Sequence, residues 1–243
     1  MSDAWQDYGL MRMYERFTSI MRSADNAVES WVAGQLGWVA RPELSLSGLD
    51  LGCGVGSWTR WLNELACTSV LGVDSSPVML SRASVATTSA YVRYSEQRIV
   101  DVTETADVVL CVYAAHHAGP PDVVLSHIGS LVRPGGIAIV VDVINTGGWE
   151  RLDYHRVRAE RLSSLVAERV GDVEAKEVRE LLLHPTWLAM IAEDTPPSLA
   201  QFVEASRLAL PYSVVTSLGP ETVGLIWRPD GTAMWKHGIS ASA

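Results

Sequence analysis

Short apolar runs alternate with segments of helical spacing between residues 48 and 144. Each run is brief enough to form a buried strand, and the intervening segments carry apolar residues at the spacing of an amphipathic helix. This alternation predicts a parallel, doubly wound sheet with right-handed crossovers. The predicted strands are Gly48–Leu51, Ser69–Val73, Tyr91–Tyr94, Asp107–Tyr113 and Ile137–Ile144, and the predicted helices are Trp58–Leu65, Pro77–Ala83 and Pro121–Leu131.

Helical patterns flank this region on both sides. Residues 3–22 form an amphipathic pattern with an aromatic face, and we expect Asp25 to cap a second helix over Ala27–Leu36. After the fifth strand, two charged helical stretches are too long for a plain connector, so we expect them to cap the carboxyl edge of the sheet. These stretches are Trp149–Val170 and Glu174–Glu193, and His184-Pro185 interrupts the second.

The C-terminal part of the chain has a different pattern. Thr195-Pro196 predicts a helix start, with proline at the first helical position, that leads into Ser198–Leu210. The apolar segments that follow are typical of an antiparallel set rather than another strand–helix unit. They are Tyr212–Ser217, Val223–Arg228 and Thr232–His237.

Composition and charge exclude several classes of protein. The chain has 243 residues, 48% hydrophobic and 19% charged, which is typical of a globular protein. A net charge of −9 and the presence of only two lysines argue against binding to nucleic acid or a membrane surface, which needs clustered cations. A local basic pocket for one anionic group is still compatible with this composition.

The cysteines and the apolar runs indicate the cellular compartment in which the protein works. Cys53, Cys67 and Cys111 lie in segments predicted to be buried, which indicates reduced thiols. The first residues lack the plan of a signal peptide, and no apolar run is long enough to span a bilayer. We therefore expect a cytoplasmic monomer or homodimer without membrane or nucleic-acid partners. The nine tryptophans either line a pocket for an apolar ligand or anchor the core.

The candidate chemistry begins where the first predicted strand ends. The sequence Leu49-Asp50-Leu51-Gly52-Cys53-Gly54-Val55-Gly56 leads from an apolar strand through three glycines into a helix. Backbone N–H groups in such a loop can contact the polar end of a nucleotide. Asp74 ends the second strand about 20 residues later, where a carboxylate can accept both hydroxyls of a ribose. Alternatively, Asp74 or Ser75 caps the next helix.

In combination, these motifs resemble those of the class I S-adenosylmethionine-dependent methyltransferases, in particular the small-molecule (metabolite) branch. The spacing Gly-x-Gly-x-Gly differs from the Gly-x-Gly-x-x-Gly of nicotinamide enzymes. Besides the glycine loop, the resemblance rests on Gly72-Val73-Asp74-Ser75-Ser76-Pro77-Val78-Met79-Leu80, on Ala106-Asp107-Val108-Val109-Leu110-Cys111 followed by His116-His117, and on Leu131-Val132-Arg133-Pro134-Gly135-Gly136.

The resemblance implies an α/β fold with a doubly wound, mostly parallel seven-stranded sheet and an antiparallel C-terminal strand. An N-terminal helical lid and a helical cap after strand five complete it. The predicted units are a lid over residues 1–40, a Rossmann-like core over 41–146 and 195–243, and a cap insertion over 147–194.

The resemblance also implies where S-adenosyl-L-methionine binds. The methionine end of the cofactor lies along the glycine loop, with Asp50 or a water bound to it near the amino group, and the ribose lies at Asp74. Adenine is expected near Met79, and the sulfonium near Val112 and Tyr113. Independently of the resemblance, Glu96-Gln97 follows the third strand, where a side-chain acceptor can meet the adenine amino group, and the nearby Asp101 is the alternative. The predicted cofactor-binding residues are Asp50, Gly52, Cys53, Gly54, Gly56, Asp74, Ser75, Met79, Glu96, Gln97, Val112 and Tyr113.

His116 and His117 follow the fourth strand and are the candidate catalytic bases. A base is needed only if the accepting atom must lose a proton. Alternatively, one of the two histidines packs or fixes its loop by hydrogen bonds. No spaced His, Asp or Glu partners are evident nearby in the sequence, so no metal site is expected.

Candidate substrate contacts come from three other segments of the chain. Tyr8 and Tyr14 lie on the N-terminal helix, Asn145 and Asp142 near the end of strand five, and Tyr154 on the first cap helix. The alternative for the two N-terminal tyrosines is core packing. The alternative for the cap residues, which include His155 and Arg158, is a solvated helix face.

The expected function is S-adenosylmethionine-dependent methyl transfer to a small, partly apolar metabolite. O- or N-methylation is favoured over C-methylation, by in-line displacement in a capped pocket that excludes water. One alternative is an enzyme of this fold that binds the same cofactor and catalyses a non-methylating reaction, such as a cyclisation or rearrangement. The other is a non-catalytic cofactor-binding subunit.

Overall fold

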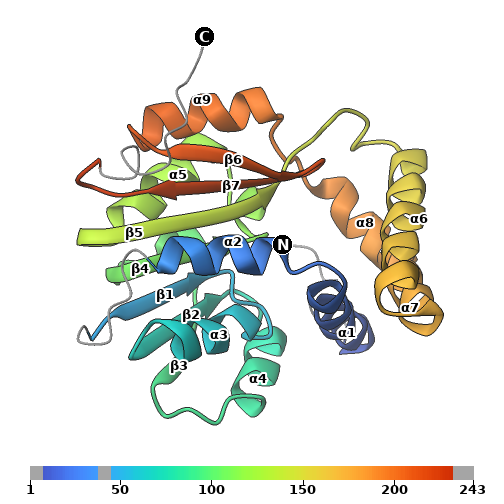
Figure 1. Ribbon diagram of the computed structural model, residues 1–243, viewed down its shortest axis with the longest axis horizontal. Coiled ribbons are helices and arrows are strands. Elements are labelled where there is room, and N and C mark those ends of the chain that lie inside the picture. Colours follow the sequence, from blue (N-terminus) through green and yellow to red (C-terminus); the bar gives the residue numbers. More distant parts are fainter. Residues whose placement is uncertain (1–7, 38–44, 232–243) are drawn as a thin grey trace.

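The computed structural model describes residues 8–37 and 45–231. Within these ranges, seven strands form one sheet in the order β3-β2-β1-β4-β5-β7-β6 (Figure 1). Strand β7 runs antiparallel to both β5 and β6, and the other pairs of neighbouring strands are parallel, so the predicted fold class is confirmed. The strands are β1 (Ser47–Leu51), β2 (Ser69–Asp74), β3 (Val92–Glu96), β4 (Ala106–Val112), β5 (Val132–Val143), β6 (Val214–Gly219) and β7 (Thr222–Trp227).

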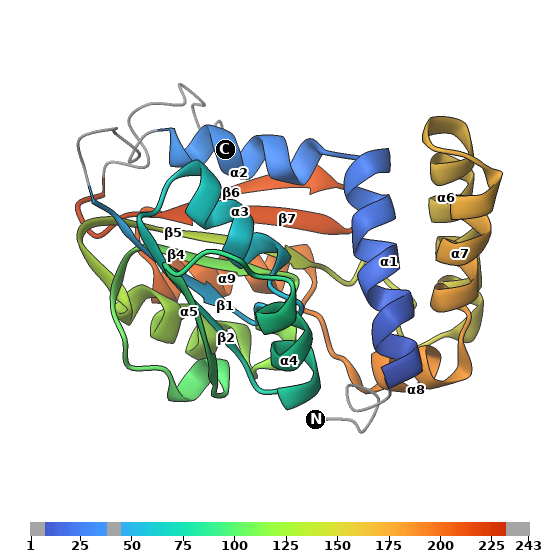
Figure 2. The same cartoon turned by 90° about the horizontal axis from the view of Figure 1, so that it is seen from below.

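Helices cover both faces of this sheet (Figure 2). Along β4, Val109 packs in the cluster that holds α5 and α9, whereas Val108 and Leu110 pack in the cluster that holds α2 and α3. Alternate residues of a strand point to opposite faces, so an almost continuously apolar strand must be covered twice. The helices around the sheet are α2 (Ala27–Leu36), α3 (Ser57–Leu65), α4 (Pro77–Val85), α5 (Pro121–Ser130) and α9 (Leu199–Ala209).

Four further helices lie together beyond the carboxyl ends of the parallel strands (Figure 1). They are α1 (Tyr8–Ala24), α6 (Leu152–Arg169), α7 (Asp172–Leu182) and α8 (Pro185–Glu193). Met11 of α1, Val178 of α7 and Trp187 of α8 belong to one apolar cluster. The N-terminal helix therefore packs with the cap helices. The division into lid, core and cap remains a prediction.

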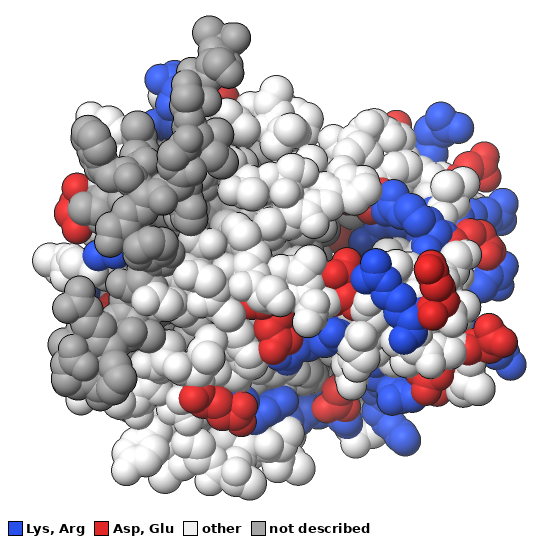
Figure 3. All heavy atoms as spheres, viewed as in Figure 1, with Lys and Arg blue, Asp and Glu red and all other residues white. Residues whose placement is uncertain are grey.

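The surface of the cap differs from that of the sheet layers. Lys and Arg side chains are interspersed with Asp and Glu over the cap, at the right of Figure 3, whereas most of the remaining described surface in this view is uncharged. In the described ranges, no helix combines the length and the apolar character needed to cross a membrane.

The structure corrects three local predictions. Helix α9 begins at Leu199, where Ser198 and Gln201 form a reciprocal capping box, so the predicted start at Thr195-Pro196 is wrong. The cap position of α2 is Asn26 instead of Asp25, although Oδ1 of Asp25 accepts a hydrogen bond from the Ala27 N–H at 3.0 Å. Strand β5 begins at Val132, earlier than expected. The predicted strand Thr232–His237 and the start of the segment 3–22 lie outside the described residues.

Gly224 of β7 marks a close approach between the sheet and α2. A Cβ atom added at Gly224 would lie 2.6 Å from the ring of Trp31. The missing side chain is therefore what allows the indole to approach the strand this closely. Gly34, on the same helix as Trp31, has nothing within 4 Å of an added Cβ.

We expect Gly224→Ala to lower the free energy of unfolding by about 1–3 kcal/mol, because it overpacks a closed contact. Gly34→Ala is the matched control, and it should raise the free energy of unfolding by about 0.5–1 kcal/mol because alanine favours a helix interior. Urea unfolding followed by circular dichroism measures both. Equal effects of the two changes would contradict the packing argument.

Candidate active site

A cavity of about 640 Å³ lies between the carboxyl ends of the parallel strands and the cap helices. Its walls include the loop after β1, the ends of β2 and β4, and residues of α1, α6 and α8. The strand order reverses between β1 and β4, and open α/β sheets bind ligands in the crevice at this point. The parallel topology therefore positions the cavity, and the cap encloses it.

The glycine loop is held against the second strand by backbone hydrogen bonds. The N–H groups of Gly52 and Cys53 both donate to the carbonyl of Val73, at 2.8 and 2.9 Å. Gly52 has a φ of 71° and Gly54 a φ of 53°, in the region that favours glycine. A Cβ on Gly52 would clash with Ala114, whereas a Cβ on Gly54 would meet nothing within 4 Å. The loop thus packs tightly at Gly52 and leaves open space at Gly54.

Asp74 fixes this loop from the end of β2. Its Oδ2 accepts a hydrogen bond from the Gly54 N–H at 2.9 Å, and its Oδ1 accepts one from the Ser76 N–H at 2.8 Å. Burial raises the pKa of Asp74, and the backbone N–H groups oppose this shift. Ser76 occupies the N-cap of α4 and accepts from the Met79 N–H, so neither Asp74 nor Ser75 is the capping residue.

Asp50 lies behind the loop instead of in the cavity wall. Its side chain is buried, and its Oδ2 accepts a hydrogen bond from the Thr59 hydroxyl at 2.6 Å. Burial raises the pKa of Asp50 to about 7, although the Thr59 hydrogen bond opposes this shift. The position predicted to meet a ligand's amino group is therefore a buried link between β1 and α3.

His116 is tied to Asp142 of β5 by two hydrogen bonds. The His116 N–H donates to Oδ2 of Asp142 at 2.8 Å, and the ring Nδ1 lies 2.6 Å from Oδ1. Burial alone would lower the pKa of His116, but the charge and hydrogen bond of Asp142 outweigh it, and the pKa is raised. In the neutral ring, Nδ1–H donates to the carboxylate and Nε2 is left as the acceptor. Since His116 lines the cavity, this arrangement suits a general base.

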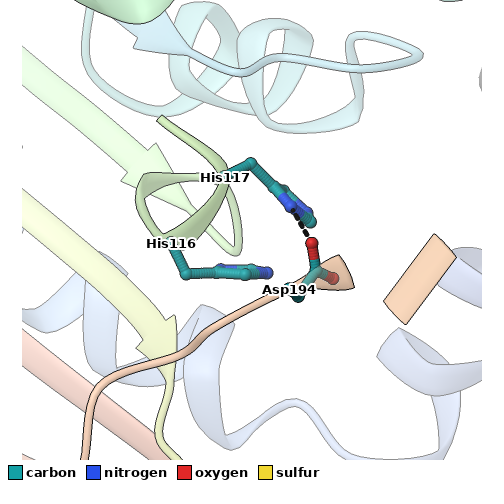
Figure 4. A group of neighbouring side chains, drawn as sticks. All are labelled: His116, His117 and Asp194. Atoms are coloured by element: carbon teal, nitrogen blue, oxygen red, sulfur yellow. Dashed lines mark hydrogen bonds and ion pairs between the residues drawn. The ribbon is translucent and has the colours of Figure 1, made fainter. Parts of the chain in front are cut away.

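His117 contacts a residue of the cap. Its Nδ1 lies 2.8 Å from Oδ1 of Asp194, a residue 77 positions away that follows α8, as Figure 4 shows. The rings of His116 and His117 lie against each other, with centroids 3.9 Å apart. Candidate ligand atoms of the two histidines and Asp194 all lie within 4.8 Å of one another. Folding therefore supplies a carboxylate partner that was not evident in the sequence around the histidine pair.

Most of the predicted site residues come together around this cavity. Those that line it are Tyr14, Gly52, Cys53, Gly54, Asp74, Ser75, Met79, Gln97, Val112, Tyr113, His116 and His117. Tyr113 has a φ of 57°, a strained backbone region for a bulky residue that is common at functional sites. Tyr14 is also stacked on Trp187, with ring centroids 5.7 Å apart, so the cavity wall and the core packing share this residue.

Six predicted site residues lie outside the cavity wall: Tyr8, Asp50, Gly56, Glu96, Asn145 and Tyr154. Tyr8 is exposed, with the Arg82 guanidinium over its ring. Oδ1 of Asn145 accepts from the Gly147 N–H at 2.8 Å, and the Tyr154 hydroxyl donates to Glu221 at 2.7 Å. Tyr8 and Tyr154 thus contact residues from distant segments, whereas Asn145 fixes its own turn, and the predicted binding roles of these residues stay predictions.

Sequence reasoning missed several residues of the cavity wall. Asp194, Glu221 and Arg161 reach it from segments distant in the chain, and no local motif marked them. The high tryptophan content did indicate a ligand pocket, because Trp58, Trp149 and Trp187 all line the cavity.

Comparison with known proteins identifies similar chains. Residues 23–174 match the family model described as a methyltransferase domain. The ubiquinone biosynthesis O-methyltransferase of Mesorhizobium japonicum is 28% identical over 150 residues, which are 58% of this chain and 59% of that protein. The chain therefore matches less than two thirds of the length of this curated relative.

Two solved structures share the fold over most of the chain. The plantazolicin methyltransferase BpumL in complex with SAH has a TM-score of 0.59 and 12% identity, over 93% of both chains. Magnesium protoporphyrin IX methyltransferase from Synechocystis PCC 6803, with bound SAM, has a TM-score of 0.55 and 16% identity, over 93% of this chain and 94% of that one. At these identities, the likeness shows the fold alone.

We expect the pKa of His116 to lie above 6.5 and to fall below that value in Asp142→Asn, because burial then acts without the carboxylate. A titration of the imidazole nitrogens by NMR measures both values. A raised folded-state pKa means that the pair stabilises the fold below pH 6.5 and that this contribution is lost as the pH rises through the folded-state value.

The loss of unfolding free energy in Asp142→Asn should therefore be larger near pH 6.5 than well above it. Asp153→Asn, at an exposed position of α6, is the control and should change neither quantity. A pKa of His116 that is the same in both proteins would contradict the role of Asp142.

Proposed function

This chain belongs to the methyltransferase-domain family, and we propose that it transfers a methyl group from S-adenosyl-L-methionine to a small, partly apolar metabolite. The observation that carries the proposal is one cavity lined by both the glycine loop with Asp74 and His116. A cofactor subsite and a candidate base thus lie in the same space. The cap helices contribute to the walls of that space and so limit its exposure to water.

The residues present fit this cofactor. Space is open at Gly54, where a side chain would fill the cradle, and the Asp74 carboxylate, whose oxygens together offer about four lone-pair sites, lines the cavity beside it, where it can accept ribose hydroxyls. Ser75, Met79 and Gln97 line the cavity beyond Asp74, where adenine would lie. When bound, S-adenosylmethionine supplies an electrophilic methyl group on a sulfonium. The backbone at Tyr113 borders the cavity between this subsite and His116.

His116 accepts a proton from the substrate atom that takes the methyl group. Asp142 orients the ring and stabilises the imidazolium that forms, as a carboxylate does for a catalytic histidine in other enzymes. Such a base is useful for a hydroxyl or amine acceptor. The name of the relative from Mesorhizobium japonicum, an O-methyltransferase, supports oxygen as the acceptor. Val112, Trp149 and Ile191 give the cavity the apolar walls that a partly apolar substrate needs.

We expect Asp74→Ala to weaken the binding of S-adenosylhomocysteine by about 1–3 kcal/mol, because hydrogen bonds to a charged group are lost. Isothermal titration calorimetry measures the affinity, and circular dichroism checks the fold. Asp153→Ala, exposed on α6, is the control and should bind like the wild type. Unchanged binding by folded Asp74→Ala would contradict the ribose assignment.

We also expect methyl-labelled S-adenosylmethionine to label at least one member of a panel of hydroxylated and aminated aromatic metabolites. His116→Gln should lower kcat for that compound by about 10²–10⁴-fold, because general-base catalysis is lost, and should leave the affinity for S-adenosylhomocysteine unchanged. Turnover without label transfer would instead support a non-methylating reaction. Cofactor binding without any turnover would support a non-catalytic subunit.

A further inference from the structure

Two arginines of the cap share one carboxylate at the cavity wall. Arg158 and Arg161 lie one turn apart on α6, and both line the cavity. Nε of Arg158 and Nη2 of Arg161 lie 2.9 and 2.8 Å from the same oxygen, Oε2 of Glu221. Oε1 of Glu221 accepts from the Tyr154 hydroxyl at 2.7 Å. The cluster therefore holds two positive charges and one negative charge.

The negative charge of Glu221 is already engaged. Burial alone would raise the pKa of Glu221, but the Tyr154 hydroxyl and the two arginines hold it below its usual range, so this carboxylate is ionised at neutral pH. In the described part of the chain, no ion pair joins Arg158 or Arg161 to a second carboxylate.

Other charged residues of the cavity wall have partners of their own or lie exposed. Arg22 pairs with Glu29 at 2.8 Å, and Asp194 contacts His117. Asp25 is exposed and accepts a hydrogen bond from the Ala27 N–H. The surplus positive charge at α6 therefore has no compensating group within ion-pair distance in the described ranges.

Arg158 also has hydrogen-bond donors that its contact with Glu221 does not use. Its side chain is only 17% exposed, yet among the described residues only its Nε has a hydrogen-bond partner. In the described ranges, no nitrogen of Arg158 is among the fully buried polar atoms that lack a partner, so its Nη donors remain accessible from the cavity that Arg158 lines. Nη1 and Nη2 form a planar fork that matches the two oxygens of a carboxylate.

The surroundings of this fork are apolar. The Arg158 Cζ lies 5.7 Å from the centre of the Trp149 ring. Leu162 and Leu165, further along α6, line the same cavity. A ligand whose carboxylate reaches Arg158 would therefore place an aromatic or aliphatic body against these side chains.

We propose that Arg158 and Arg161 form a subsite for the carboxylate of an apolar or aromatic acid. The subsite rests on the proposed function and names its substrate class: the carboxylate anchors the substrate while another of its atoms faces His116.

Isothermal titration calorimetry on the protein saturated with S-adenosylhomocysteine tests the subsite. The probes are benzoate, cinnamate and 1-naphthoate, with the corresponding amides as uncharged controls. We expect at least one carboxylate to bind at least about tenfold more tightly than its amide, because charge-assisted hydrogen bonds are formed. Arg158→Gln should abolish this preference without changing the affinity for S-adenosylhomocysteine. Arg156→Gln, at an exposed position of α6, should keep the preference.

Two further results would overturn the subsite, besides a wild type that does not prefer the carboxylates. If Arg158→Gln loses affinity for S-adenosylhomocysteine itself, the arginines hold the cofactor's own carboxylate. If Tyr154→Phe, which removes a hydrogen bond to Glu221 without changing any charge, also abolishes the preference, Arg158→Gln acts by loosening the cap. A wild type that does not bind S-adenosylhomocysteine contradicts the proposed function instead, and the same probes titrated into the protein alone then decide the subsite.

Discussion

The candidate site depends on the burial of one carboxylate, Asp142, at the end of β5. A buried carboxylate must be paired and hydrogen-bonded to be tolerated. Asp142 accepts from the backbone of His116 and Val143 and lies against Nδ1 of His116. The turn after β4 is therefore fixed beside β5, and the imidazole is oriented by the same group that compensates the buried charge. Asp74 has a similar role at the end of β2, where its carboxylate accepts a hydrogen bond from the Gly54 N–H and so fixes the glycine loop.

The cap is attached to the rest of the protein in two ways. Its apolar cluster includes Val55 of the glycine loop and Met79 of α4, so the cap packs directly on the proposed cofactor cradle. On the other side of the cavity, polar contacts join it to the sheet layer, from Asp194 to His117 and from Arg158 to Glu221. Because all of these contacts border the cavity, the bound molecules would complete the interface between cap and sheet. Cofactor binding and substrate enclosure are thus physically linked.

The sequence carried the features that depend on local pattern. The strand–helix alternation, the glycine loop and Asp74 could be predicted because periodicity and spacing encode them directly. Glu221 and Asp194 could not, because their roles arise from pairing with residues far along the chain, Arg158 and His117. Prediction from local sequence also failed where two neighbouring sequence signals favour different starts for the same helix.

Such a competition occurs at the start of α9. Pro196 favours a helix start. However, the side chains of Ser198 and Gln201 each accept a hydrogen bond from the other residue's backbone N–H, and this capping box sets the start of the helix at Leu199. Tyr154 shows that the role of a side chain is also hard to predict from its local sequence position. Its place on the cap predicted a substrate contact, which stays a prediction, and its hydroxyl donates to Glu221 beside the arginine cluster, a contact that the local sequence pattern did not indicate.

The acidic composition of the chain and a cationic pocket are compatible for a physical reason. A net charge of −9 opposes the approach of an anion only at long range, and salt screens charges separated by more than about 8 Å at physiological ionic strength. Over the cap surface, cations and carboxylates are interspersed, so their fields largely cancel (Figure 3). Inside the cavity, the dielectric is lower and screening is weaker, so one guanidinium in excess of its carboxylate determines the local potential. An acidic net charge that disfavours polyanions is therefore compatible with the proposed binding of a single carboxylate at Arg158.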